Sequence, residues 1–404
     1  MKFTIRLLCY ISLCCGLPLL FIQGRSTFSG FNFGLQVSLL VSAVVLFISA
    51  VNFHFFAKFP GERSGLSVLS IFGAWFGVAI TVIILLRLPY SLSYLTISLL
   101  GVICCLFFEF FYTKQQKNIM AFIPMGRSGE IYQIQGVEWI RLDTPELPRE
   151  KINAIVADLH SPDLGDSWQN FLADCALEGI SVFNIRQIEE SLTGKIKIHH
   201  MYENDLGSLQ PSPFYIHIKY LLDILLILLS LPLVIIVVIL TAIAIKLDDG
   251  GKIFYFQDRV GFRNKTFTAY KLRSMSEASS THTTVQNDQR ITRVGRFIRK
   301  TRIDELPQFL NVLKGEMSLI GPRAEYLAFA QELEKEVPFF NYRHIVKPGI
   351  SGWAQVMQGY ATGAEETKTK LEYDFYYIKH FSFSLDVLIF FKTIKTMLTG
   401  FGAR

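Results

Sequence analysis

The sequence is poor in the features that mark an ordinary soluble, disulfide-stabilised or zinc-binding protein. Only 18% of its 404 residues are charged while 50% are hydrophobic, a balance too apolar for an ordinary soluble protein. Five of its six cysteines lie in apolar segments and Cys175 stands alone, so their spacing predicts neither a zinc site nor a disulfide framework. The sequence contains no pattern typical of nucleic-acid binding. Its net charge of +6 comes from cations clustered beside apolar segments and in the last third, which indicates a membrane protein with phosphate substrates.

Four apolar segments open the chain, at about residues 3–23, 34–57, 66–88 and 91–113, and each is long enough to span a bilayer. The first lacks a convincing small-residue cleavage site and is followed by three more, so we interpret it as a retained helix rather than a signal peptide. Cations gather on one side of the resulting topology, which predicts that both ends of the bundle lie in the cytoplasm. Residues 1–115 are therefore predicted to form a four-helix transmembrane domain.

Residues 116–213 are more polar and are predicted to form a small cytoplasmic α/β domain of Rossmann-like type. Short apolar runs at 119–124, 152–156 and 179–185 predict strands, and the pattern at 168–177 predicts a helix. A glycine-containing segment, Gly126-Arg-Ser-Gly129, leaves a nucleotide site open, but it lacks the G-x-G-x-x-G spacing. We therefore favour a structural or regulatory domain. The pair His199 and His200 is interpreted as surface residues rather than metal ligands.

The apolar run that follows Lys219 and continues to Ile245 admits two interpretations, a fifth spanning helix or a helix that enters one leaflet and returns. Asp223 lies inside the run, and Pro232 near its middle breaks the helical hydrogen-bond ladder. Cations flank both ends, which places both ends in the cytoplasm by the positive-inside rule. The sequence therefore favours a re-entrant membrane helix over about residues 217–246, with Asp223 paired to Lys219 one turn earlier.

Two adjacent carboxylates, Asp304 and Glu305, follow a segment that is dense in Arg and Lys. Pro307 is tolerated in the first turn of a helix, and Thr301 followed three residues later by Asp304 resembles a capping box. We therefore expect a helix to begin at the two acids. Ionised acids among so many cations suit a polyanionic substrate and a divalent metal.

A series of motifs in a fixed order occupies the rest of the chain. They are Lys219-x-x-x-Asp223 with Ser230 and Pro232, Gln257-Asp-Arg259-Val-Gly261, Tyr270-Lys271-Leu-Arg273-Ser274-Met275, Asp304-Glu305-Leu-Pro307-Gln308, Gly315 to Arg323, Lys347 to Gln355, and Tyr373-Asp374. With these motifs, residues 214–404 resemble the monotopic phosphoglycosyl transferases, also called bacterial sugar transferases. The layout of the first 213 residues is similar to the larger members. Asn264, Ala324 and Leu231 depart from the family's usual residues, and Asn264 should preserve its turn because Asn accepts a left-handed backbone.

The resemblance implies an enzyme that moves a hexose-1-phosphate from a UDP-sugar to undecaprenyl phosphate and releases UMP, initiating exopolysaccharide, capsule or O-antigen synthesis. Asp304 would be the nucleophile that forms a phosphosugar-aspartate, and Glu305, with Asp304, would hold Mg²⁺. The mainly α catalytic domain, residues 214–404, would lie on the cytoplasmic face of the bacterial inner membrane, against the phospholipid bilayer, in a possible homodimer. The implied substrate-binding residues are Lys271, Arg273, Arg299, Arg302, Pro322, Arg323 and Gln355. For any one of the cations, a solvated or lipid-facing position is the alternative.

Two other classes of function stay open at this point. An inactive scaffold for polysaccharide assembly is disfavoured because the chain keeps both acids among its arginines. A transporter is disfavoured because the first four apolar segments contain no interior acid except Glu109, near an end. No motif discriminates between glucose, galactose and N-acetylated sugars.

The aromatic residues near the C-terminus also admit two interpretations. Trp353, Tyr360 and the cluster Tyr373–Tyr377 either stack on uracil or lie at the level of the lipid headgroups. His344 and His380 are interpreted as packing or interface residues. Residues 387–398 are predicted to form an amphipathic helix on the membrane surface.

Overall fold

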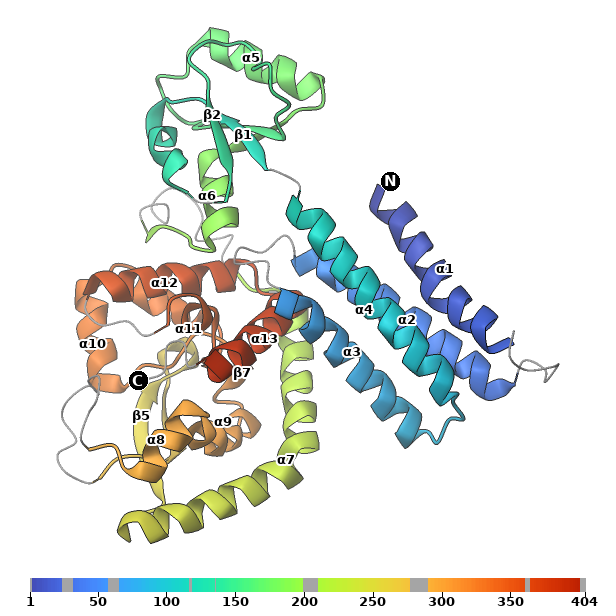
Figure 1. Cartoon of the computed structure of the whole chain (residues 1–404). Coiled ribbons are helices and arrows are strands. Elements are labelled where there is room, and N and C mark those ends of the chain that lie inside the picture. Colours follow the sequence, from blue (N-terminus) through green and yellow to red (C-terminus); the bar gives the residue numbers. More distant parts are fainter. Residues whose placement is uncertain are drawn as a thin grey trace. The chain divides into compact units, whose positions relative to one another are not determined.

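The computed structural model describes residues 2–23, 32–56, 65–115, 118–134, 136–198, 210–276, 290–359 and 364–399. The chain divides into two compact units, Met1–Thr193 and Gly194–Arg404 (Figure 1). His199, His200 and Tyr360, which the sequence analysis singled out, lie outside the described residues.

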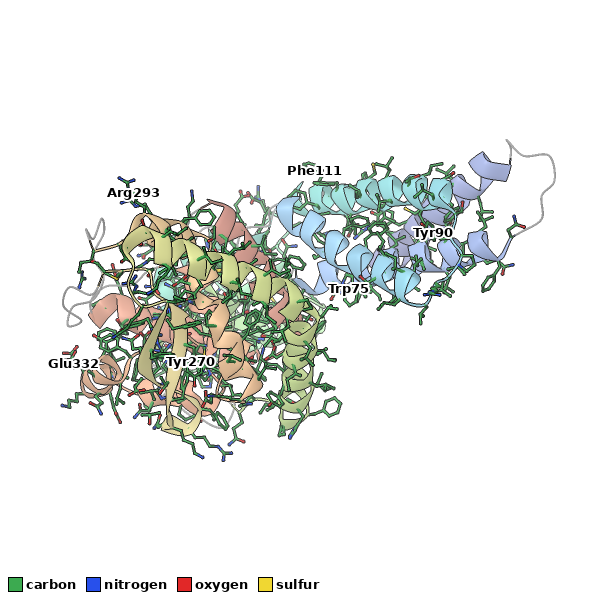
Figure 2. The ribbon with its side chains drawn as sticks, turned by 90° about the horizontal axis from the view of Figure 1, so that it is seen from below. Trp75, Tyr90, Phe111, Tyr270, Arg293 and Glu332 are labelled. Carbon is green, nitrogen blue, oxygen red and sulfur yellow. The ribbon has the colours of Figure 1, made fainter. Side chains whose placement is uncertain are left out.

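The four N-terminal apolar segments are helices, as predicted: α1 (Lys2–Gln23), α2 (Phe33–Phe56), α3 (Gly65–Leu85) and α4 (Leu92–Gln115). Helix α4 contacts the other three, and Figure 2 shows their side chains, with Phe111 of α4 exposed. In the described part of the chain, three stretches are long and apolar enough to cross a membrane: Phe33–Phe53, Leu92–Tyr112 and Pro213–Asp249. The apolar parts of α1 and α3 are shorter, at Ile5–Leu20 and Ile71–Leu85. These helices are compatible with a membrane protein.

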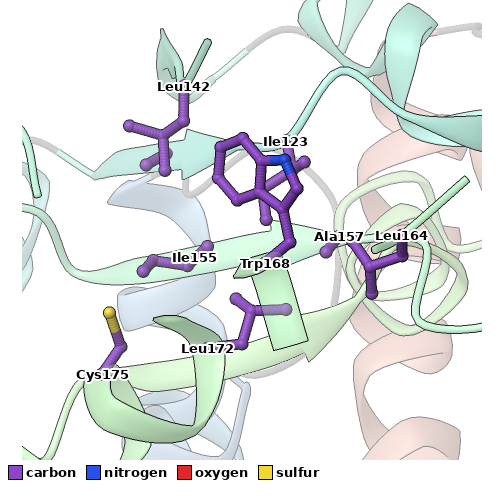
Figure 3. Close-up of a cluster of buried hydrophobic side chains, with 9 residues drawn as sticks. Ile123, Leu142, Ile155, Ala157, Leu164, Trp168, Leu172 and Cys175 are labelled. Carbon is purple, nitrogen blue, oxygen red and sulfur yellow. The ribbon is translucent and has the colours of Figure 1, made fainter. Parts of the chain in front are cut away.

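The remainder of the first unit contains a parallel sheet in the order β2-β1-β3-β4. Its strands are β1 (Ile119–Phe122), β2 (Glu138–Arg141), β3 (Ala154–Ala157) and β4 (Ser181–Asn184), with the 3₁₀ helix η1 (Gly126–Gln133) and the helices α5 (Asp166–Leu177) and α6 (Ile185–Thr193). Side chains alternate between two cores, because successive strand residues point to opposite faces. Trp168 and Leu172 of α5 pack with Ile155 on one face (Figure 3), and Ile188 of α6 packs with Val156 on the other. The predicted α/β arrangement is confirmed, and β2 is a strand that the sequence analysis did not predict.

The second unit begins its described helices with α7 (Pro213–Asp249), whose 37 residues contain Pro232. Figure 1 shows that α7 is bent, as expected of a helix with an internal proline. The expected pairing of Asp223 with Lys219 is wrong: Lys219 Nζ lies 2.6 Å from Asp386 Oδ2, and Asp223 accepts hydrogen bonds from Ser318 Oγ and from the Leu319 backbone N–H. Both α7 residues are buried. They therefore attach the first half of α7 to the body of the unit.

An antiparallel hairpin follows, formed by β5 (Phe254–Val260) and β6 (Thr266–Leu272). Its turn, η3 (Phe262–Asn264), places Asn264 at φ 59°, the left-handed conformation that the sequence analysis expected of this residue. Most of the remaining unit is helical: α8 (Arg293–Lys300), η4 (Ile303–Gln308), α9 (Phe309–Leu313), α10 (Leu327–Glu336), η5 (Phe340–Ile345), α11 (Trp353–Met357), α12 (Ala364–Lys379) and α13 (Phe383–Thr399). The two short strands β7 (Ser318–Ile320) and β8 (Gly349–Ser351) pair in parallel.

The aromatic residues of α11 and α12 form part of the core. Trp353 is 0% exposed, stacks on Tyr376 with ring centroids 5.7 Å apart, and donates from its indole nitrogen to the Gly194 carbonyl. Tyr377 is also buried and donates to Asp386. Neither interpretation of these aromatics, uracil stacking or membrane interface, is therefore correct for Trp353, Tyr376 and Tyr377. His344 and His380 pack against Phe340 and Tyr376, as expected.

Candidate active site

A left-handed turn places the two acids at the start of a short helix. Thr292 caps the start of α8 by accepting a hydrogen bond from the Gly295 N–H, and Thr301 ends that helix by donating to the Phe297 carbonyl. Arg302 then adopts φ 55°, and Asp304 and Glu305 occupy the first turn of the 3₁₀ helix η4. The acids begin a helix as predicted, but the expected capping box at Thr301 is wrong because this threonine belongs to the end of the preceding helix.

The Glu305 carboxylate is buried and surrounded by cations. Its Oε1 lies 3.0 Å from Arg323 Nη1 and 3.2 Å from Lys271 Nζ, and its Oε2 lies 3.6 Å from Arg302 Nη1. Burial alone would raise the pKa of Glu305, but Lys271, Arg323 and Arg302 outweigh it and hold this pKa well below its usual range. Glu305 is therefore ionised at neutral pH. Its Oε2 accepts no hydrogen bond from the described residues.

The Asp304 carboxylate has a different environment. It is half-buried, and in the described part of the chain we find no hydrogen bond or ion pair to it. Burial and the neighbouring charge of Glu305 raise the pKa of Asp304 to about 6, against the opposing effect of Lys271, Arg323 and Arg299. At neutral pH this carboxylate is ionised and has free lone pairs. A weakly solvated anion without a partner is suited to nucleophilic attack.

Arg259 is a further cation of this region that the prediction of substrate-binding residues did not include. It donates to the Ala324 carbonyl and, over 2.9 Å, to Gln257 Oε1, while its Nε has no hydrogen-bond partner among the described residues. Burial and the charge of Arg323 lower the pKa of Arg259 to about 10, and burial lowers the pKa of Lys271 to about 8. The signal for Arg259 in the sequence was its position two residues after Gln257 in one strand, because strand residues two apart point to the same face. The cations therefore exceed what the two acids neutralise, which favours an anionic ligand.

A buried ion-pair network holds the backbone of Arg323 in place. Arg343 Nη2 donates to the Arg323 carbonyl over 2.9 Å and lies 2.7 Å from Asp374 Oδ2. Arg343 Nη1 lies 3.6 Å from Glu325, which also pairs with Lys370. Asp374 lies in one of the sequence motifs, but the sequence alone does not identify Arg343 as its partner. This network fixes the backbone that carries the Arg323 side chain to Glu305.

The structure brings four of the predicted substrate-binding residues to the acids. Lys271, Arg302 and Arg323 contact Glu305. The positive charge of Arg299 favours the ionised form of Asp304 and so opposes the rise of its pKa. Arg273 instead pairs with Asp249 at the end of α7, and we find no contact between it and the acids within the described residues.

The other two predicted substrate-binding residues, Pro322 and Gln355, are buried. The Pro322 carbonyl accepts a hydrogen bond from the Gly349 N–H over 2.9 Å. A Cβ on Gly349 would come within 2.0 Å of the Gly321 nitrogen, so this close approach requires glycine. Gln355 lies in α11 with its Oε1 unpaired among the described residues. In α7, Ser230 donates to the Ile227 carbonyl over 3.1 Å.

The expected Mg²⁺ can be compared with the groups that the site offers. Within the described residues no cluster of three or more His, Cys, Asp or Glu could hold a metal. Mg²⁺ in phosphate-transferring sites, however, is bound by one or two carboxylates and takes its other ligands from substrate phosphates and water. Asp304 and Oε2 of Glu305, which accepts no hydrogen bond from the described residues, match that donor set. The residues present therefore fit a metal that arrives with its phosphate substrate.

Comparison with known proteins identifies the family of the chain. A family model described as bacterial sugar transferase matches residues 214–400. The UDP-N-acetylgalactosamine-undecaprenyl-phosphate N-acetylgalactosaminephosphotransferase of Aeromonas hydrophila is 46% identical over 374 residues, which cover 91% of this chain and 88% of that protein. The UDP-glucose:undecaprenyl-phosphate glucose-1-phosphate transferase of Xanthomonas campestris pv. campestris is 30% identical over 296 residues, covering 72% of this chain and 54% of that protein. The Escherichia coli K12 protein of the same name is 38% identical over 177 residues, covering 43% and 38%. The chain belongs to the bacterial sugar transferase family.

Proposed function

We propose that this protein transfers an N-acetylhexosamine-1-phosphate from a UDP-sugar to undecaprenyl phosphate and releases UMP. The observation that carries the proposal is the pair of adjacent acids with opposite environments. Glu305 is enclosed by three cations, whereas Asp304 is ionised at neutral pH and unpaired within the described part of the chain. The transfer begins a polysaccharide repeat unit on the lipid.

The proposed reaction has two steps that use one carboxylate. Asp304 attacks the phosphorus next to the sugar, the bond from this phosphorus to the bridging oxygen breaks, and UMP leaves with the electron pair. An oxygen of undecaprenyl phosphate then attacks the same phosphorus, and Asp304 leaves as a carboxylate. The products are UMP and the undecaprenyl diphosphate sugar, and the enzyme is regenerated.

The cations around the acids support the first step. Lys271 and Arg323 lie at 3.2 Å and 3.0 Å from Glu305, where they offset the repulsion between the attacking carboxylate and the diphosphate. Arg259 supplies an additional buried positive charge. A Mg²⁺ ion held by Asp304 and Glu305 would neutralise further charge on the diphosphate.

The choice of sugar rests on the relatives. The Aeromonas protein, named for N-acetylgalactosamine, matches nearly the whole chain at 46% identity, whereas the glucose-named proteins match 72% and 43% of it at 30% and 38%. UDP-N-acetylgalactosamine is therefore the donor that we propose.

The proposed location is the inner membrane, with the first four helices spanning it, α7 re-entrant and the acids on the cytoplasmic side. Both ends of α7 attach to the same folded unit, which supports a re-entrant path. Near its start Lys219 pairs with Asp386, and at its end Asp249 pairs with Arg273 while Asp248 accepts from the Val294 N–H. The bend in α7 also supports this path, because a straight helix of 37 residues would be about 55 Å long and would hold its two ends far apart.

The test is UMP release by the purified full-length protein from a panel of UDP-sugars, with undecaprenyl phosphate and Mg²⁺ present. We expect turnover with UDP-N-acetylgalactosamine above UDP-glucose and UDP-galactose. Turnover with UDP-glucose alone would show that the proposed sugar is wrong and that the proposed transfer reaction is right. Absence of UMP with every donor would favour the scaffold interpretation.

A further inference from the structure

The β5–β6 hairpin has two faces, and one of them borders the acids. Tyr255, Gln257 and Arg259 share a face of β5, because alternate strand residues point to the same side. Tyr255 pairs directly with Lys271 of β6, whose Nζ lies 3.2 Å from Glu305. Directly opposed residues of an antiparallel pair lie about 5 Å apart at their Cβ atoms. The Tyr255 side chain therefore lies beside a cation of the candidate active site.

Tyr255 combines this position with exposure. Its side chain is 43% exposed, whereas the aromatics that the sequence analysis offered for stacking, Trp353 and Tyr376, are buried in the core. Three consecutive aromatics at the start of β5 are exposed, but Phe254 and Phe256 belong to the other face of the strand, where Phe256 packs on Tyr270 with ring centroids 5.6 Å apart. Of these three, only Tyr255 lies on the side of Lys271 and Arg259.

We propose that Tyr255 is the platform on which the pyrimidine base of the nucleotide donor stacks. The inference rests on the proposed function, because it requires a nucleoside diphosphate on Lys271, Arg323 and Arg259. In a nucleoside diphosphate only the ribose lies between the base and the diphosphate. When the diphosphate binds at Lys271, the base therefore reaches the ring of Tyr255, which is paired with Lys271 across the hairpin. Proteins that bind single-stranded nucleic acids combine a positively charged groove with aromatic side chains on which bases stack, and Tyr255 beside Lys271 and Arg259 offers the same two elements.

The test compares two substitutions in the full-length protein. Tyr255→Leu removes the ring, and Tyr255→Phe keeps it. Loss of base stacking corresponds to about tenfold or more in affinity. We therefore expect Tyr255→Leu to raise the KM for the UDP-sugar and the Kd of UMP by about that factor, with a much smaller change in kcat. Tyr255→Phe should keep both the KM and the Kd at their wild-type values. Phe256→Leu is the matched control: it makes the same kind of change one residue away on the opposite face, and it should leave both constants unchanged.

The use of UMP as a probe separates the competing explanations. If KM rises in Tyr255→Leu while the Kd of UMP is unchanged, the ring contacts the sugar and the proposal is overturned. If the defect is present in lipid nanodiscs and absent in detergent, the ring contacts the bilayer, and the proposal is overturned again. If the wild type releases no UMP from any donor, the proposed function fails, and the Kd of UMP for wild type and Tyr255→Leu still decides the inference by calorimetry.

Discussion

Arg343 is expected to influence catalysis and stability by separate routes, and a pair of variants separates them. Its guanidinium is 2% exposed and lies 2.7 Å from Asp374, which is 1% exposed. Arg343→Met leaves Asp374 buried without this partner, and breaking one side of a buried ion pair costs about 3 to 5 kcal/mol. For a unit of this size that loss lowers the apparent Tm by an amount on the order of 10 °C.

The double variant Arg343→Met, Asp374→Leu removes both charges at once. Replacing a whole buried ion pair by apolar groups is often neutral, and Glu325, the other acid beside Arg343, keeps its pairing with Lys370, so we expect most of the lost Tm to return. The Arg323 carbonyl, however, still lacks the hydrogen bond that Arg343 Nη2 donates over 2.9 Å. We therefore expect kcat/KM for the donor to stay about tenfold below wild type, since a net hydrogen bond of about 1.5 kcal/mol corresponds to that factor.

The assay pairs differential scanning fluorimetry with UMP release at equal protein concentration. Arg293→Met is the matched control, because Arg293 is an exposed arginine of α8 (Figure 2), and neither quantity should change. A single variant as stable as wild type would refute the reasoning about the buried pair. A double variant that recovers both stability and full activity would refute the positioning role.

Three further outcomes follow from the same contacts. Arg323→Ala should lower kcat/KM for the donor by about 100-fold while circular dichroism stays unchanged, because it removes a phosphate-binding cation rather than core packing; unchanged kinetics would move the phosphate site elsewhere. Arg273→Met should lower the Tm and leave the donor KM unchanged, because Arg273 pairs with Asp249; a large rise in KM would restore it as a ligand. A cysteine at Asn264 should resist a membrane-impermeant thiol reagent in intact cells and react after permeabilisation, with the native cysteines replaced by serine; labelling in intact cells would mean that α7 spans the membrane.

Features governed by local sequence were predictable. Continuous apolar runs located α1 to α4 and α7, and short apolar runs located β1, β3 and β4. The adjacency of Asp304 and Glu305 required no tertiary information. Strand β2, with sequence Glu-Trp-Ile-Arg, lacks the apolar run by which its neighbours were recognised, and its assignment depends on pairing with β1.

Features that depend on long-range packing were not predictable. Lys219 pairs with Asp386, 167 residues away, instead of the acid one turn later on its own helix. Arg343 similarly reaches both Arg323 and Asp374. The buried Trp353 illustrates a related difficulty, because an aromatic side chain suits a core, a membrane interface and a ligand platform equally well. Thr301 looked like a helix cap because the sequence alone did not indicate that α8 already begins at Arg293, with Thr292 as its N-cap.

The most direct test of the account is whether Asp304 becomes covalently modified. Full-length protein is mixed with UDP-N-acetylgalactosamine and Mg²⁺ without undecaprenyl phosphate, quenched, and measured by intact-mass spectrometry and peptide mapping. We expect a phosphosugar adduct on the peptide that contains Asp304, discharged when undecaprenyl phosphate is added, and no adduct in Asp304→Asn. An adduct that persists in Asp304→Asn, or UMP release in step with lipid product and no adduct at any time in the wild type, would contradict the assignment of Asp304 as the nucleophile.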